Sequence, residues 1–310
     1  MAFKRLDPED FIVSSDSVTS TVWSNNSPSL NTYFTSSTQK EGTSGPYYLS
    51  VYQTASNSIS AAVQFQIAYA NKNGGGGVNF DSSVPFVSPT TTIYGQYRTL
   101  VLEDENAAFT WGPTYTGSAD NDFYVISIER ARYKQSLLPG SLNLILSSSN
   151  TNKSPLRLTD DSNQVTLPTF YGTMRAYQLI SGSNGSSHDG GTGYTELYGS
   201  YGLVLPDIST ILLNAAALDA NGNNDGGINI GTITTADTFG DNPSKLYNHI
   251  SGSVSVIPLT NPATSNIFEL NSQETLTSDY VFIRARNSEY NYTENPSFIS
   301  GSTGEVIYPY

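Results

Sequence analysis

The chain has 310 residues, of which only 13% are charged and 12% are aromatic, including 21 tyrosines. It has no cysteine, which excludes disulfides, thiol nucleophiles and cysteine zinc sites. The formal net charge of −13 argues against nucleic acid as a partner, because binding to a phosphate backbone depends on clustered Lys and Arg.

The low charge and the many tyrosines predict a protein whose outer face is covered by other proteins. An ordinary soluble domain has about 25% charged residues. Few charges give weak protection against association, and tyrosine offers a large, rigid contact area with a hydroxyl that tolerates water. We therefore expect protein–protein docking rather than enzymatic activity.

The length exceeds the roughly 250 to 300 residues at which a single core stops growing. We expect two lobes, or one long sandwich with insertions.

No stretch approaches the roughly 20 apolar residues needed to span a bilayer, so no membrane partner is expected. Lys4 and Arg5 precede acidic residues rather than an apolar run, so we expect no secretory signal.

Residues 1–45 are predicted to form an extended N-terminal arm. This segment is rich in Ser, Thr and Asn, and apolar residues such as Phe11 and Trp23 are scattered through it without a period. We expect Lys4, Arg5, Phe11 and Trp23 to contact a neighbouring protein. The alternative, equally open, is a segment that lies on the surface of its own domain.

Residues 46–150 are predicted to form a β-rich lobe with one helix. Val63, Phe65, Ile67 and Tyr69 alternate with smaller or polar residues, the pattern of a strand with one buried face. The run Asn73–Gly77, with four consecutive glycines, predicts a loop that is too flexible to order without a partner.

The helix is expected at about residues 89–102. Ser88 is a candidate N-cap, and Pro89 suits the first turn. The acidic run Glu103–Glu105 is unfavourable at the C-terminal pole of a helix, so the helix should end near Leu102. Helical spacing predicts one apolar face, made of Ile93, Tyr97, Leu100 and Val101.

Short strand candidates separated by Gly, Pro, Asn and Asp continue to the end of the chain and indicate antiparallel sheets. They are Phe109–Trp111, Phe123–Arg130, Leu142–Ser147, Val165–Leu167, Ala176–Ile180, Gly202–Leu205, Thr210–Leu213, Val254–Ile257 and Tyr280–Ala285.

A weak boundary near residues 147–155 would make 151–310 a second β-rich lobe, with long loops at Ser181–Gly199 and Asp219–Gly240. The predicted fold is thus mainly β: antiparallel β-sandwich-type lobes, one or a few short helices and an extended N-terminal arm.

Candidate chemical sites are weak. Asn221, Asn223 and Asp225 resemble spaced calcium ligands, but Thr232 stands where a closing Glu is required, so a plain loop is favoured and no cofactor is expected. His188 lies in a glycine-rich loop, and we expect His249 to be a hydrogen-bonded residue at the start of a strand.

Carboxylate pairs could serve a glycosidase, which needs two acids at a set separation. Glu103–Glu105 and Asp160–Asp161 are the candidates, and we expect solvated faces or turns at both.

The basic residues concentrate beside a tyrosine in Glu129–Gly140. Arginine next to tyrosine is typical of interface anchors. The alternative is that these side chains pair internally with acids. The candidate interface residues here are Arg130, Arg132, Tyr133 and Lys134.

Several stretches resemble virion structural proteins of contractile-tailed bacteriophages, especially T4-like phages of marine cyanobacteria. The resemblance extends over most of the chain, and its relatives offer no catalytic or binding residue to carry over. The stretches are Phe3–Phe11, Ser17–Trp23, Thr92–Leu100, Glu129–Tyr133 with Leu137–Leu142, and Gly199–Leu203.

The resemblance implies a structural part of the virion, in the baseplate or adjoining tail, assembled in the host bacterial cytoplasm. Its partners would be other tail or baseplate subunits and copies of itself. Absence of cysteine fits a reducing compartment. Two alternatives stay open: a receptor- or glycan-binding tail module or depolymerase, which would have aromatic residues lining a groove, and a head or neck decoration protein.

Overall fold

The computed structural model describes residues 8–36, 47–77, 83, 87–107, 109–111, 120–149, 154–188, 193–195, 198–220, 226–231, 241–253, 267–282, 299–300 and 305–306. The chain divides into two compact units: unit 1 is Met1–Ser17 with Thr275–Tyr310, and unit 2 is Val18–Glu274. The described part is mainly β with antiparallel pairing, which confirms the predicted fold class.

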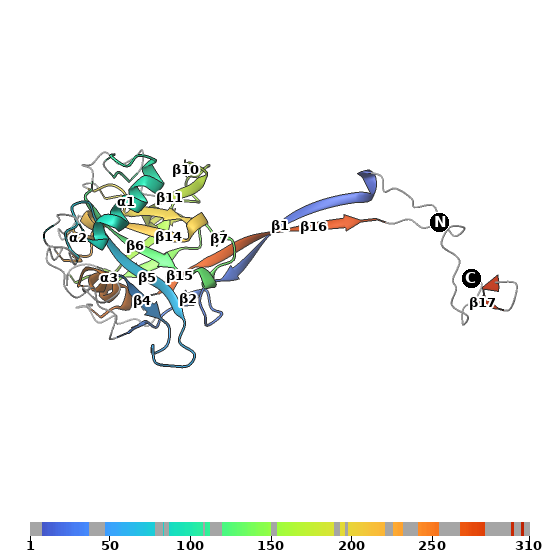
Figure 1. Ribbon diagram of the computed structural model, residues 1–310, viewed down its shortest axis with the longest axis horizontal. Helices are drawn as coiled ribbons and strands as arrows, with labels where there is room; N and C mark the ends of the chain where they lie inside the picture. Colours follow the sequence, from blue (N-terminus) through green and yellow to red (C-terminus); the bar gives the residue numbers. More distant parts are fainter. Residues whose placement is uncertain are drawn as a thin grey trace. The chain divides into compact units, whose positions relative to one another are not determined.

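Most described strands belong to one 13-stranded sheet (Figure 1). Its order is β2 (Ser29–Leu30), β15 (Phe268–Glu269), β8 (Asn143–Leu146), β9 (Leu156–Asp160), β11 (Met174–Ser183), β13 (Gly202–Leu205), β14 (Thr210–Asn214), β6 (Asp122–Ile128), β5 (Val63–Asn71), β4 (Leu49–Tyr52) and β3 (Phe34–Thr35), with β10 (Thr169–Tyr171) and β12 (Ser186–Ser187) paired to β11.

The remaining described strands form two small sheets, and three helices complete the regular structure. One sheet joins β1 (Phe11–Thr21), β16 (Asn271–Val281) and β7 (Ser136–Leu137), and the other joins β17 (Ile299–Ser300) and β18 (Glu305–Val306). The helices are α1 (Pro89–Leu102), α2 (Ala215–Asp219) and α3 (Asp241–Ser251), with 3-10 turns η1 (Pro8–Asp10), η2 (Arg130–Arg132) and η4 (Pro206–Ile208).

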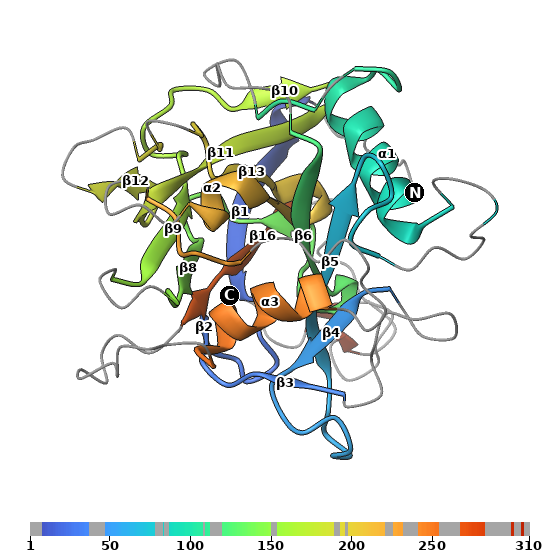
Figure 2. The same cartoon turned by 90° about the vertical axis from the view of Figure 1, so that its left-hand side faces the viewer.

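The large sheet bends back on itself around the main core of unit 2. Six strands separate β15 from β5 in the sheet order, yet the rings of Phe268 and Phe65 lie 5.3 Å apart. Helix α3 contacts both halves, through β8 and β5 (Figure 2). It adds the side chains of Leu246 and Ile250 to this core. The two halves of one sheet therefore face each other like the layers of a sandwich.

A second core lies on the opposite face of β6, β13 and β14. Side chains alternate along β6, so that Tyr124 and Ile126 enter the main core while Phe123 and Val125 enter the second. Helix α1 covers this face with Tyr94, whose ring centroid is 5.4 Å from that of Phe123. Both faces of the central strands are therefore buried, which explains their nearly continuous apolar sequences.

Compact units do not follow the division expected from the sequence. The expected lobe boundary at residue 150 falls between β8 and β9, which pair with each other inside unit 2. The expected arm, residues 1–45, is also divided: β1 crosses the unit boundary, and Leu30 lies in the main core. The sequence misses both points because pairing between distant segments leaves no local signal.

Helix α1 has the predicted bounds, Pro89–Leu102, and ends in a left-handed cap at Glu103 (φ 55°), whose N–H bonds to the Thr99 carbonyl. Two details differ from the expectation. The Ser88 hydroxyl lies 3.0 Å from the Thr90 hydroxyl instead of capping a backbone N–H, and Leu100 is exposed.

Several other local predictions need correction. The glycine run is ordered within the chain, because the Asn71 side-chain oxygen accepts from the N–H groups of Asn73 and Gly75, at 2.9 and 3.1 Å. Val165–Leu167 is not a strand but part of the turn after β9, and Leu167 is 76% exposed. The expected strand at Val254–Ile257 lies outside the described residues.

Gly95 in α1 offers a direct test of the helix. A Cβ added at Gly95 would meet no atom within 4 Å. Because glycine costs a helix interior roughly 0.5–1 kcal/mol relative to alanine, Gly95→Ala is expected to raise the free energy of unfolding by about that amount in urea titrations. As a matched control, Gly140→Ala should lower it, since Gly140 has φ +81°. A destabilised Gly95→Ala would contradict the helix environment described.

Candidate functional site

Unit 1 contains a two-stranded antiparallel ribbon, defined as Phe11–Ser17 of β1 with Thr275–Phe282. The N–H of Phe282 donates to the Asp10 carbonyl at 2.8 Å, and farther along, in unit 2, the hydroxyls of Ser20 and Ser272 lie 2.8 Å apart. Ten residues separate the two contacts on each strand, so the register continues without a bulge. Phe11 then stands opposite Val281, and Ile12 opposite Tyr280.

The end of the ribbon is apolar on both faces. Six large apolar side chains, 45–55% exposed, occupy it: Phe11, Ile12, Val13, Tyr280, Val281 and Phe282. Because side chains alternate along a strand, Ile12, Tyr280 and Phe282 share one face, and the other three share the opposite face. Within the described residues this is a concentrated exposed apolar surface, and such surfaces mark sites of interaction.

The ribbon also lacks the usual protection against strand addition. No other described strand pairs with Phe11–Ser17 or Thr275–Val281. Proteins blunt free edges with Lys, Pro or bulges, but both strands lack Lys, Arg and Pro, and the charges in Asp10–Ser17 and Thr275–Phe282 are all acidic, at Asp10, Asp16 and Asp279. Among the described residues, no further strand covers these edges, and apolar side chains on both faces are exposed.

The structure distributes the predicted interface residues differently. Phe11 lies in the ribbon, as an arm contact would require. Trp23 does not serve as an exposed anchor: it is 1% exposed in the main core, where its ring packs against Phe65 and Phe268. Lys4 and Arg5 lie outside the described residues.

The basic cluster at η2 makes mainly local contacts. The Arg130 guanidinium lies 4.7 Å from the Tyr133 ring centroid and donates to the Tyr133 carbonyl at 2.9 Å. Arg130 and Lys134 are exposed, and Arg132 and Tyr133 are half-buried. The ion pair found within the described residues joins Arg175 to Asp207 instead. The role of this cluster as an interface stays a prediction.

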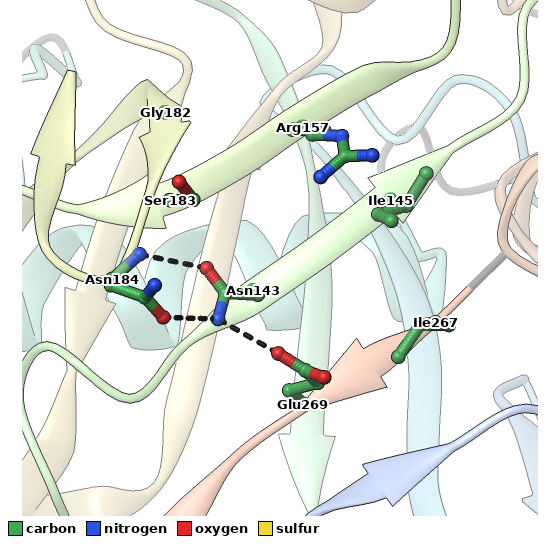
Figure 3. Close-up of a pocket in the computed structure, with 8 residues that line it drawn as sticks. All are labelled: Asn143, Ile145, Arg157, Gly182, Ser183, Asn184, Ile267 and Glu269. Atoms are coloured by element: carbon green, nitrogen blue, oxygen red, sulfur yellow. Dashed lines mark hydrogen bonds between the residues drawn. The ribbon is translucent and has the colours of Figure 1, made fainter. Parts of the chain in front are cut away.

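A polar pocket of about 240 Å³ lies beside β8, β9 and β15 (Figure 3). The Asn143 amide donates to Asn184 at 2.8 Å and to Glu269 at 2.9 Å, and the Glu269 carboxylate also accepts from Ser29. Arg157 lines the same pocket with an exposed side chain. The side chains of Asn143, Asn184 and Glu269 thus bond to one another, whereas the Arg157 guanidinium lines the pocket without bonding to them.

A larger pocket, of about 390 Å³, is acidic. Asp122 and Asp219 line it together with the ring of Tyr124. Burial, followed by the neighbouring carboxylates Asp120 and Asp219, raises the pKa of Asp122 to about 6, against a hydrogen bond from the Tyr69 hydroxyl that lowers it. A carboxyl whose pKa is raised toward neutral pH is a candidate acid or base, although purely structural pairs produce such shifts as well.

The other candidate chemical residues have structural roles. Asp160 accepts from the Gly140 N–H with both oxygens at 2.9 Å, and Asp161 accepts from the Gln178 N–H at 3.0 Å. Of the expected solvated faces or turns, the turn is found, since Asp161 begins the turn after β9, but both side chains are buried rather than solvated. His249 is not at a strand start but in α3, buried, with Nδ1 2.6 Å from the Ser147 carbonyl oxygen; burial lowers its pKa.

Asn221, Asn223 and Asp225 lie outside the described residues. Within the part that is described, no group of three or more His, Asp or Glu side chains could hold a metal ion. No described helix combines the length and apolar character needed to cross a bilayer. His188 is exposed after β12.

The C-terminal strand of the ribbon is the main part of the candidate site that the sequence analysis did not identify. A strand was expected from Tyr280, whereas β16 ends at Val281 and begins at Asn271. Its polar residues Asn271–Asp279 show weak alternation, and its partner strand lies more than 250 residues away. The signal available in the sequence was the spacing of the two aromatic residues Tyr280 and Phe282, which places them on one face of a strand.

Comparisons with protein-family models, with curated proteins and with solved structures found no match for this chain.

Proposed function

We propose that this chain is a structural component of a tailed-phage virion, placed in the baseplate or tail, and that it acts by docking to neighbouring virion proteins rather than by catalysis. The observation that supports docking is the ribbon with its exposed apolar end. The resemblance of the stretches described above supports the virion assignment, and the low charge content is consistent with it.

Physical considerations favour a docked ribbon. An isolated two-stranded hairpin is marginally stable in water, and six large apolar side chains at its end remain in contact with solvent. Burying them on a neighbour contributes about 25 cal/mol per Å², from which the cost of ordering is subtracted. Strand addition at the open edges would supply backbone hydrogen bonds as well.

Charge selects the kind of neighbour. The ribbon carries acidic side chains at Asp16 and Asp279, with Asp10 directly before it, and no basic ones within Phe11–Ser17 and Thr275–Phe282. Pairing two copies of the ribbon would bring like charges together, which costs free energy. We therefore favour a different virion protein, with an apolar surface rimmed by Lys or Arg.

Immunogold labelling of intact particles of the encoding phage tests the assignment directly. Label on the baseplate or tail is the expected result. Label confined to the head or neck would favour a decoration protein instead. Label nowhere on the particle, with the antibody shown to recognise the folded chain, would reject the virion proposal.

The ribbon has its own test. Replacing Ile12, Tyr280 and Phe282 together by serine is expected to reduce incorporation into particles at least tenfold, because it removes the apolar side chains of one ribbon face. Incorporation would be measured by quantitative immunoblotting of purified particles after complementation with the variant gene.

A matched control replaces three exposed apolar residues of unit 2, Val165, Leu167 and Phe170, by serine. Incorporation of this control should remain normal. Thermal unfolding of both variants establishes that unit 2 is intact. Normal incorporation of the ribbon variant would overturn the docking role of the ribbon without affecting the virion assignment.

A further inference from the structure

A third pocket, of about 230 Å³, lies between α1 and the sheet in unit 2. Its floor comes from β5 and β6, where Gln66 is paired with Ser127, and Ala68 with Val125. One wall is the α1 face that carries Ile93, Gln96 and Tyr97. The other side is formed by Tyr47 and Tyr48, which directly precede β4.

The lining combines aromatic rings with neutral polar groups. The rings of Tyr47 and Tyr48 meet edge to face, 5.8 Å apart, and both side chains are exposed. Tyr97 is half-buried, and its ring packs edge to face against that of Phe123, with centroids 6.3 Å apart, so the ring is held in place. Apolar surface and hydrogen-bonding groups thus meet in one small concave site.

The polar groups of the floor and wall are not used by the protein itself. In the described part of the chain, the side chains of Gln66, Gln96 and Ser127 make no hydrogen bond. Each amide offers donors and an acceptor, and the Ser127 hydroxyl can act as either. None of the described residues that line the pocket is charged.

We propose that this pocket binds an uncharged sugar residue of a glycan. A pyranose has an apolar C–H face and a rim of hydroxyls that both donate and accept. The tyrosine rings can contact the C–H face of the sugar. The amides of Gln66 and Gln96 and the Ser127 hydroxyl can form hydrogen bonds with its hydroxyls. The inference is independent of the proposed virion role.

Other ligand classes fit the lining less well. An anionic sugar would find no Arg or Lys in the described lining and would approach a chain of net charge −13. A proline-rich peptide can also pack on tyrosines. Proline has no backbone N–H, so it would leave the Gln66 and Gln96 carbonyl oxygens without donors, which is unfavourable in a partly desolvated site.

Titration calorimetry and saturation-transfer NMR on the full chain test the proposal. The probes are the methyl glycosides of glucose, galactose, mannose and N-acetylglucosamine. We expect at least one to bind with a Kd on the order of 1 mM, the range in which a small ligand gains a few kcal/mol. Galacturonate should bind at least tenfold more weakly than the best neutral probe.

Two substitutions should lower the affinity for that probe at least tenfold: Tyr48→Ala removes a ring, and Gln96→Leu removes an amide at an exposed helix position that should not disturb folding. The matched controls are Phe170→Ala, an exposed aromatic residue of unit 2, and Gln164→Leu in an exposed turn, and both should bind as the unaltered chain does. Thermal unfolding confirms that each variant is folded.

Several results would overturn the sugar site. They are the absence of binding by all four neutral probes, equal binding by the pocket variants, and binding of decaproline that depends on Tyr48 while no sugar binds. Because these measurements use the isolated chain, they are separate from the particle labelling that tests the proposed function.

Discussion

Trp23→Ala is expected to lower the free energy of unfolding of unit 2 by about 3–5 kcal/mol, the usual cost of truncating a large buried aromatic side chain. Trp23 is 1% exposed, and its ring centroid lies 4.9 Å from that of Phe268 and 6.2 Å from that of Phe65. Its indole N–H donates to the Pro28 carbonyl at 3.0 Å. The substitution would leave a cavity where the two halves of the bent sheet meet.

Urea unfolding followed by far-ultraviolet circular dichroism measures this effect, because the signal does not depend on the tryptophan that is removed. Phe11→Ala is the matched control, since both residues were expected to be arm contacts and Phe11 is 45% exposed. It should change the free energy of unfolding by less than about 1 kcal/mol. A loss below about 1 kcal/mol for Trp23→Ala would show that Trp23 is not a core residue in solution.

Asp122→Asn is expected to stabilise the protein at pH 7.5 by about 1–2 kcal/mol and to have little effect at pH 4. The pKa of Asp122 is raised by burial from 3.8 to about 6. Each pKa unit corresponds to about 1.4 kcal/mol of free energy. Because the carboxylate is partly exposed, the expected gain is smaller than the free energy that the whole pKa shift would give. An asparagine can still accept the hydrogen bond from the Tyr69 hydroxyl, now 2.9 Å from Asp122.

The direction in which Asp122 changes the stability with pH follows from proton linkage. Between pH 4 and pH 6 the folded state holds the Asp122 proton while the unfolded state has lost it, so stability falls as the pH rises through this window. Above about pH 6 both states are ionised, and the full cost of the buried charge remains. The asparagine variant has no buried charge at this position. Its free energy of unfolding should therefore exceed that of the unaltered chain by an amount that grows from pH 4 to pH 6 and then stays constant.

The quantity to compare at each pH is the difference in the free energy of unfolding between Asp122→Asn and the unaltered chain. The stability of either protein alone also depends on other groups, whose contributions change with pH in the opposite direction. His249 has a lowered pKa, so its contribution is lost as the pH falls below its unfolded value. Burial of the Asp207 carboxyl acts to raise its pKa, but the hydrogen bonds from Arg175 outweigh burial and lower it, so that its contribution is also lost in acid.

Urea titrations of the unaltered chain and Asp122→Asn at several pH values measure this difference. Asp16→Asn, at an exposed ribbon position, is the control for the loss of one negative charge. A constant difference between pH 4 and pH 7.5 would contradict the raised pKa. A destabilised Asp122→Asn at pH 7.5 would indicate that the carboxylate is needed as an ion.

The number of tyrosines in the sequence does not show which of them are buried and which are exposed. Many tyrosines suggested a broadly sticky surface, yet Tyr69, Tyr94 and Tyr124 are fully buried. Burial raises the pKa of Tyr201 to about 12, and its hydroxyl donates to the Gly226 carbonyl. The exposed tyrosines that carry the two proposals, Tyr48 and Tyr280, could not be distinguished from these by composition, because exposure depends on what packs above each ring.

The sequence by itself determined the mainly β character, the bounds of α1 and strands such as Gly202–Leu205, because alternation, helix caps and turn residues act over a few neighbouring positions. It could not determine that β1 pairs with β16, that Trp23 lies between two halves of one sheet, or that Tyr48, Gln66 and Gln96 share a pocket. Only the tertiary structure decided these points. Many apolar segments of the chain have similar local patterns, and which of them pack together and exclude water depends on the fold of the whole chain.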